Sequence, residues 1–160
     1  MLVKSGGWKA KLPAIHMSPD SSLAMREARY PVTHAGLLSL AETILGYNRQ
    51  DLQQKTYAHC HELEDQTVGE RACHCFVMEY RDREASKDYR KSVTMIDKEW
   101  AVPVYIKNFG WPNEDAPVAD EELDEATLIE HYTYTDIKFR TSLSHRDFDH
   151  GNEDYNFSRQ

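Results

Sequence analysis

The sequence is poor in the features that mark membrane-spanning and nucleic-acid-binding proteins. It has no apolar run of the ~20 residues that a transmembrane helix needs. Basic charge is also scarce, since the formal net charge is −8 over 160 residues. A protein that binds a phosphate backbone usually presents a basic surface. We therefore expect no transmembrane segment and no nucleic-acid partner.

Cysteines and recognisable catalytic motifs are scarce as well. Three cysteines are too few for a disulfide framework, and their redox state stays open. The chain has no P-loop, no dinucleotide-binding glycine fingerprint and no G-x-S-x-G nucleophile elbow. We therefore predict a protein that is not an enzyme, with no catalytic residues and no cofactor.

What is present indicates one globular domain, residues 1–160. The hydrophobic share is 40%, and 160 residues can bury a sizeable core. The opening "MLVKSGGWKAKL" predicts two short strands joined at residues 5–7. This opening has no continuous apolar segment like that of a secretory signal. Taken alone, it predicts a cytoplasmic protein if Met1 is the true start.

One long helix is predicted in "YPVTHAGLLSLAETILGYNRQDLQQK", residues 30–55. Thr33 suits the N-cap, and Val32 can contact Leu37 as a hydrophobic staple. Gly46 is the position where the helix is weakest. The apolar positions repeat with helical spacing, so this helix needs an apolar surface to lie on. They are Leu37, Leu38, Ala41, Ile44, Leu45 and Leu52.

From residue 55 onward the apolar period changes to two, which predicts strands. Five candidates follow one another at residues 55–64, 71–82, 89–100, 102–111 and 126–140. Short connections favour an antiparallel meander, with Pro103 at the start of its strand. The acidic stretch 114–125 is expected to be a solvated loop, and Phe148 a packing residue. The fold class is therefore α+β, a long amphipathic helix on a curved antiparallel sheet.

The stretch "AHCHELEDQTVGERACHCF" raises the question of a metal site, because zinc prefers thiolate and imidazole. If His61 faced Cys73, then His59, His61, Cys73 and Cys75 would share one face. The turn chemistry instead favours a type II′ turn with Gly69 first, which pairs Val68 with Arg71. Carried along the hairpin, that pairing sets Leu63 opposite Phe76, His61 opposite Met78 and Cys60 opposite Glu79. We therefore predict a structural hairpin and no metal site.

Four blocks of the sequence resemble the bacterial family called domain of unknown function 1571. They are "RYPVTHAGLLSLAETIL", "GERACHCFVMEY", "IDKEWAVPVYIKNFGWP" and "LIEHYTYTDIKFRTSLSHRDFD", which span about residues 29–149. That family is similar to the periplasmic lipoprotein-carrier (LolA-like) superfamily. The resemblance implies an unclosed half β-barrel around a helix, and a periplasmic or otherwise exported protein. It also implies further strands before Met1, so we expect the chain to be the C-terminal part of a larger half-barrel domain.

By the same resemblance, the protein is expected to be an envelope protein that carries or binds an apolar ligand, a lipid or a lipoprotein acyl chain. Two alternatives stay open: a structural or protein-interaction module with a filled core, and, more distantly, a small zinc-binding protein. The expected apolar lining comes from the helix and the first hairpin. It comprises Leu37, Leu38, Ala41, Ile44, Leu45, Leu63, Phe76 and Met78.

Overall fold

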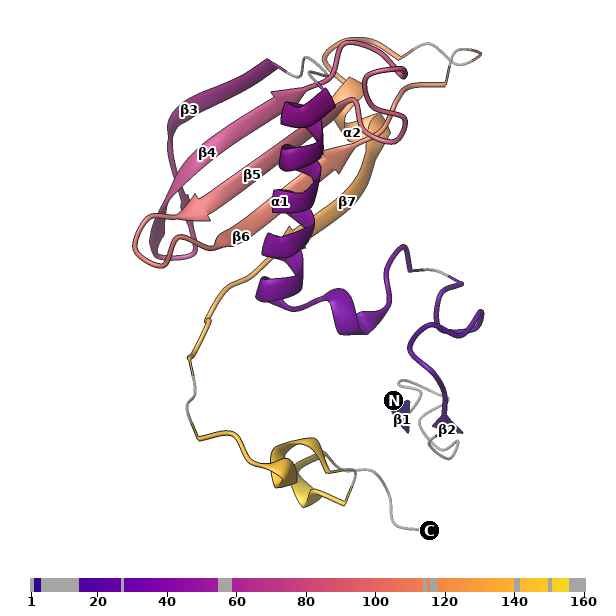
Figure 1. The fold of residues 1–160 in the computed structure, drawn as a ribbon, viewed down its shortest axis with the longest axis vertical. Helices are drawn as coiled ribbons and strands as arrows, with labels where there is room; N and C mark the ends of the chain where they lie inside the picture. The colour runs from indigo at the N-terminus through magenta and orange to yellow at the C-terminus, as the bar shows by residue number, and fades with distance from the viewer. Residues whose placement is uncertain are drawn as a thin grey trace. The chain divides into compact units, whose positions relative to one another are not determined.

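The computed structural model describes residues 2–3, 15–26, 28–54, 59–113, 115, 118–139, 142–149 and 151–155. The chain divides into two compact units, one of residues 1–35 with 138–160 and the other of residues 36–137. The unit of residues 36–137 contains the long helix and the main sheet (Figure 1). Its fold confirms the α+β prediction.

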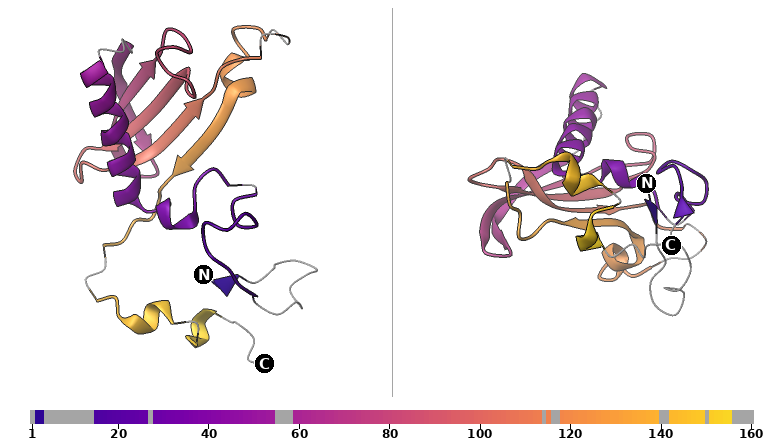
Figure 2. Two further views of the ribbon diagram at one scale, coloured as in Figure 1. Left: turned by 45° about the vertical axis from the view of Figure 1, so that its right-hand side comes forward. Right: turned by 90° about the horizontal axis from the view of Figure 1, so that it is seen from below.

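Five strands form one antiparallel sheet in the order β3-β4-β5-β6-β7, which is the predicted meander. All five predicted strands are present, and β6 begins at Pro103, as expected. Since, in the part of the chain that the structure describes, β3 and β7 each pair with one neighbour only, the sheet there does not close into a barrel (Figure 2). The strand bounds are β3 His59–Val68, β4 Arg71–Glu79, β5 Lys91–Asp97, β6 Pro103–Phe109 and β7 Leu128–Thr133.

Helix α1 spans Leu37–Gln54 and continues through Gly46 without a break. The prediction that Thr33 caps this helix is wrong. Residues Val32–His34 form a separate 3₁₀ turn that begins at Pro31, whose carbonyl accepts from the His34 N–H. The first α-type bond runs from Leu40 N–H to the Gly36 carbonyl, so the α-helix starts three residues later than an N-cap at Thr33 implies.

Helix α1 lies against one face of the sheet, called here the helix face (Figure 1). Tyr80 donates from its hydroxyl to Asp51 of α1 at 2.7 Å and also reaches Met78 of β4. Tyr89 meets Tyr47 of α1 edge-on, with ring centroids 6.0 Å apart. Because directly paired residues share a face, this face carries two cross-strand rows. They are Phe76-Thr94-Ile106-Tyr132 and Met78-Ser92-Asn108-Glu130.

The opposite face of the sheet, called here the outer face, carries Leu63, Cys75, Met95, Tyr105 and Thr133 as one row. The small buried core lies at the turn end of the first hairpin. It is formed by Val68, Cys73 and Val104, against which Met95, Val102, Tyr105 and Ile137 pack.

The acidic stretch is not only a solvated loop. Helix α2, Leu123–Thr127, starts within this stretch. Its Asp124 forms ion pairs with Arg90, just before β5, and with Lys91, the first residue of β5. Arg90 Nη2 lies 2.5 Å and Lys91 Nζ 2.6 Å from the Asp124 carboxylate. The pairing gives this part of the stretch a fixed structure that charge composition alone does not predict.

The unit of residues 1–35 and 138–160 contains a two-residue pair of strands and short 3₁₀ turns. Strand β1, Leu2–Val3, pairs with β2, Ile15–His16, while the predicted turn at residues 5–7 lies outside the described residues. A 3₁₀ turn at His145–Phe148 begins with a capping box between Ser144 and Asp147. Phe148 is 76% exposed, so the prediction that it is a packing residue is wrong. A further 3₁₀ turn spans Glu153–Tyr155.

Candidate functional site

The residues expected to line an apolar site divide into three groups. Leu37, Ala41 and Ile44 lie half-buried along α1, and Phe76 and Met78 lie half-buried on the helix face of the sheet. These five residues therefore belong to the same side of the structure. They form the candidate site, on the face of the sheet where α1 contacts β6 and where Asp51 of α1 accepts a hydrogen bond from Tyr80, just after β4.

Two other helix residues of the expected lining, Leu38 and Leu45, are turned away from the sheet. Leu38 is 73% and Leu45 51% exposed, and Leu52, farther along α1, is 80% exposed. The predicted apolar stripe is thus wider than one sheet-facing surface. It separates into a half-buried row beside the sheet and an exposed row of three leucines.

Leu63 lies on the outer face, opposite Cys75, and not with Phe76 and Met78. The predicted pairing of Leu63 with Phe76 is wrong by one residue. The cause is a bulge in β3, where Glu64 and Asp65 oppose the single residue His74 between two regular segments of pairing. Because one extra residue exchanges the two faces of a strand, Leu63 leaves the expected lining.

The same bulge decides where the histidines of the hairpin lie. Val68 is opposite Arg71 and Gly69 has φ 60°, which confirms the predicted turn. Beyond the bulge, however, His61 lies opposite Val77 rather than Met78, and Cys60 opposite Met78 rather than Glu79.

His59 and His61 are exposed with their rings stacked at 6.1 Å, whereas Cys73 and Cys75 are buried. Neither histidine is paired with a cysteine. Within the described ranges, no group of three or more His, Cys, Asp or Glu side chains is placed to hold a metal ion. Burial raises the pKa of both the Cys73 and the Cys75 thiol, and this disfavours the thiolate that metals bind.

Next to the apolar group, the helix face is polar. The residues that follow Met78 in its cross-strand row are Ser92, Asn108 and Glu130. Ser92 donates to Asn108 Oδ1 at 2.6 Å, and Asn108 donates through Nδ2 to Glu130 at 2.6 Å. The Tyr89 hydroxyl donates to the second Glu130 oxygen at 3.1 Å. Glu130 is buried, so these bonds supply the partners that a buried carboxylate needs.

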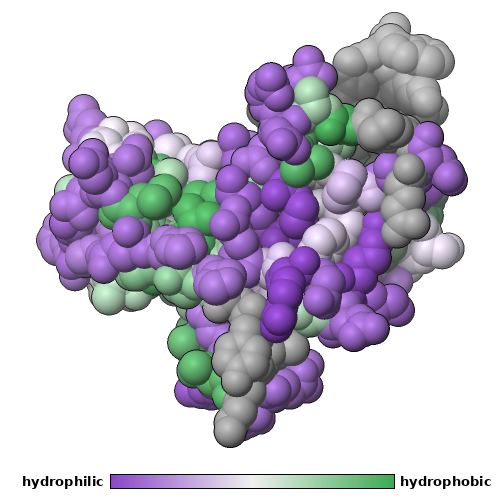
Figure 3. Space-filling model, turned by 90° about the horizontal axis from the view of Figure 1, so that it is seen from above, coloured by the Kyte–Doolittle hydropathy of each residue, from purple (hydrophilic) through white to green (hydrophobic). Residues whose placement is uncertain are grey.

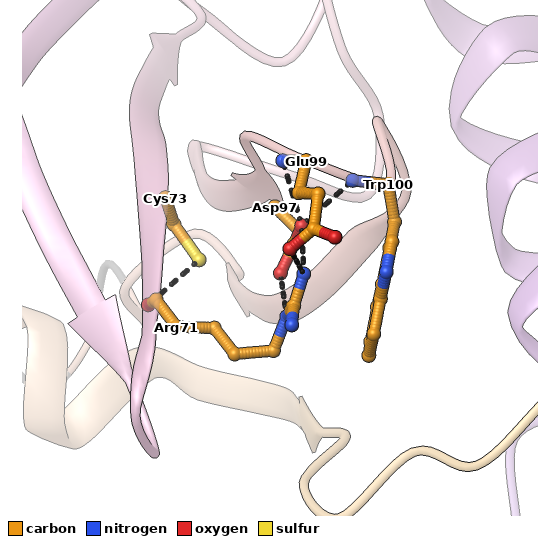
Figure 4. A network of polar contacts seen from close by, with 5 residues as sticks. All are labelled: Arg71, Cys73, Asp97, Glu99 and Trp100. Carbon is orange, nitrogen blue, oxygen red and sulfur yellow. Dashed lines mark hydrogen bonds and ion pairs between the residues drawn. The ribbon is translucent and has the colours of Figure 1, made fainter.

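A second polar cluster joins two hairpins at the turn end of the sheet (Figure 4). The Arg71 guanidinium donates two hydrogen bonds to Asp97 and a third to Glu99 at 3.0 Å, and it lies 3.3 Å from the centre of the Trp100 ring. Asp97, only 1% exposed, also accepts from the Glu99 and Trp100 N–H groups at 2.9 and 2.8 Å. These donors, the Arg71 side chain first among them, lower the pKa of Asp97 to about 2.

Sequence reasoning missed this cluster, although part of it has a local signal. An Asp that opens a tight turn commonly accepts from the N–H groups two and three residues later, as Asp97 does in "DKEW". The partnership with Arg71 has no such signal, because 26 residues separate the two and only strand register brings them together. The Asp97 oxygens are already hydrogen-bonded, so the cluster fixes the turn between β5 and β6.

A comparison with protein families covers nearly the whole chain. A family model described as "Protein of unknown function (DUF1571)" matches residues 1–157. The chain belongs to this family. No curated protein and no solved structure matches it. In the parts of this DUF1571 protein that the structure describes, no helix is both long enough and apolar enough to cross a bilayer.

Proposed function

We propose that this DUF1571 protein is a non-catalytic binding module for an apolar ligand, a lipid or the acyl chain of a lipoprotein. The supporting observation is that Leu37, Ala41 and Ile44 of α1 and Phe76 and Met78 of β4 lie on the same side of the sheet. All five side chains are only half-buried. An acyl chain laid along them would remove the remaining apolar surface from water, at about 25 cal/mol per Å².

The openness of the sheet supports the same proposal. An apolar ligand needs a concave apolar surface with an entrance, and within the described residues no further strand pairs with β3 at the edge of the five-stranded sheet. Figure 3 shows apolar side chains reaching the surface in small patches among polar ones. The lipid class itself rests on the resemblance to lipoprotein carriers, and so does our proposal that the protein is periplasmic or otherwise exported.

One observation favours a second candidate, a structural or protein-interaction module with a filled interior. The polar row Ser92-Asn108-Glu130, closed by Tyr89, occupies the part of the helix face next to the apolar group. Buried hydrogen-bonded rows of this kind fix side chains in place and leave no room for an acyl chain. If the same rigid packing extends to the half-buried apolar group, no space for a ligand remains between α1 and the sheet.

Native mass spectrometry of the gently purified full-length chain distinguishes these two functions. The binding module is expected to carry a co-purified lipid and to bind a fluorescent fatty acid saturably. Met78→Gln places a polar amide in the apolar group and should weaken probe binding about fivefold, from the loss of roughly 1 kcal/mol of apolar contact. Leu63→Gln is the matched control, because Leu63 is half exposed on the outer face, and it should leave binding unchanged.

Two results would overturn the proposal. A chain that is always free of lipid and binds no probe would favour the filled module. Equal weakening by Met78→Gln and Leu63→Gln would show that the probe does not bind specifically on the helix face of the sheet. Separation of cell compartments, followed by detection of the native gene product, tests the proposed exported location independently of binding.

A further inference from the structure

Three leucines on α1 form a straight exposed row, here called the leucine row. Leu38, Leu45 and Leu52 are spaced by seven residues and are 73%, 51% and 80% exposed. A single exposed leucine is ordinary on a protein surface. Three in line are different, because seven residues are close to two helical turns and place the side chains on one seam, about 10.5 Å apart.

The spacing of the row fits a second helix better than it fits an irregular ligand. A seven-residue repeat keeps one seam facing a partner helix along its whole length, which is the pattern by which helices pair. The other apolar residues of α1, among them Ala41 and Ile44, are half-buried on the sheet side. Among the described residues, the sheet therefore uses one side of α1, while the leucine row is exposed on another side.

Charges beside the row indicate which partner. Glu42 and Arg49 are both exposed and follow Leu38 and Leu45, respectively, by four residues. If two copies of α1 lie antiparallel about Leu45, then Leu38 meets Leu52 of the other copy and Glu42 comes beside its Arg49. The two ion pairs form together because the contact has two-fold symmetry. In a parallel pair, Glu42 would instead lie beside Glu42 of the other copy and Arg49 beside the other Arg49, so like charges would face each other.

We propose that the protein forms a two-fold symmetric dimer through the leucine row, with the two α1 helices antiparallel. This inference does not depend on the proposed ligand, which uses the other side of α1. One face of an 18-residue helix is small compared with the interfaces of stable dimers. The dimer is therefore weak, and it dissociates on dilution.

Cysteine cross-linking tests the orientation. In a Cys60→Ser background, which removes the exposed native thiol, Leu45→Cys should cross-link efficiently with a short bis-maleimide because the two copies meet at the axis. Leu38→Cys alone should not, since antiparallel copies of residue 38 lie about 21 Å apart. A mixture of Leu38→Cys and Leu52→Cys chains should cross-link again. Cross-linking of Leu38→Cys to itself would overturn the antiparallel arrangement.

Charge reversal tests the pairing by sedimentation velocity across a wide range of concentration. Glu42→Arg and Arg49→Glu should each weaken dimerisation about fivefold or more, because like charges replace two exposed ion pairs. The double variant should recover it, and a mixture of the two single variants should form a heterodimer. A chain that is monomeric at every concentration would overturn the proposal and leave the row to another segment of the chain or to an apolar ligand. Failure of the double variant to recover would also overturn it.

Discussion

At the residue scale, Asp97 is the clearest case of a side chain whose surroundings define its state. It accepts hydrogen bonds from Arg71 and from two backbone N–H groups of its own turn, and it is almost fully buried. A buried carboxylate with such partners stabilises the fold only while it is ionised. Stability should therefore depend on the charge of this residue.

We expect Asp97→Asn to lower the free energy of unfolding by about 2 kcal/mol at neutral pH, because hydrogen bonds to a charged group are lost. Glu99→Gln is the matched control. Glu99 also receives a bond from Arg71 but is 76% exposed, so little change is expected. Urea unfolding of the three proteins makes the comparison, and equal losses for both variants would contradict it.

The pH dependence of Asp97 follows from the same contacts. Its folded pKa of about 2 lies below the value near 3.9 of an unfolded aspartate. The stabilisation is therefore complete above about pH 4 and is lost as the pH falls toward 2. Below pH 4, the native protein should lose stability more steeply than Asp97→Asn does. Parallel curves of unfolding free energy against pH would show that Asp97 is not the group responsible.

The three cysteines should differ sharply in reactivity. Cys60 is exposed, whereas Cys73 and Cys75 are buried and burial raises the pKa of both thiols. Reaction requires an accessible thiolate. A thiol reagent should label one cysteine rapidly and the other two only on unfolding, and Cys60→Ser should remove the fast phase. Fast labelling that survives this substitution would place a second thiol at the surface.

At the element scale, the hairpin of β3 and β4 shows how far sequence reasoning extends. The turn at Gly69 was predictable, because its residue type and position carry a local conformational requirement. The pairing beyond Leu63 was not, since the bulge at Glu64 and Asp65 depends on how both strands twist and pack. The same limit explains α1, whose helical period was plain while its start at Leu37 depended on a 3₁₀ turn at Pro31.

Two glycine substitutions should have effects of opposite sign. Gly69 has φ 60°, so Gly69→Ala should destabilise the protein by about 1 kcal/mol. Gly46 lies within α1 with nothing within 4 Å of an added Cβ, so Gly46→Ala should stabilise it by roughly 0.5–1 kcal/mol. Thermal unfolding of both variants checks the signs. Stabilisation by Gly69→Ala would exclude the observed turn conformation.

Two tyrosines contribute to the attachment of α1 to the sheet, Tyr80 through Asp51 and Tyr89 through Tyr47. Tyr80→Phe removes the bond to Asp51 and should cost about 1 kcal/mol, with faster amide exchange concentrated in α1. Tyr105→Phe is the control, because Tyr105 lies on the outer face beside His131. Exchange in α1 should stay unchanged in that variant. If both substitutions accelerate exchange equally, the hydroxyl bond does not hold the helix.

At the scale of the whole molecule, the open sheet must avoid pairing with other copies through its edge. Strand β3 is a ten-residue edge strand with nearly every residue exposed, and such edges are templates for aggregation. The bulge at Glu64 and Asp65 interrupts this edge, and the carboxylates of Glu62 and Glu64 add negative charge to it. The net charge of −8 adds a general repulsion between copies.

The contribution of the β3 edge and the contribution of the net charge can be separated by one pair of variants. Glu64→Val and Glu121→Val remove the same charge, but only Glu64 lies on the β3 edge, while Glu121 is exposed just before α2. Glu64→Val should aggregate faster by light scattering in mild denaturant, because a β-branched apolar residue favours strand pairing. Glu121→Val should behave like the native chain. Equal acceleration would mean that net charge, rather than the edge of β3, keeps the molecules apart.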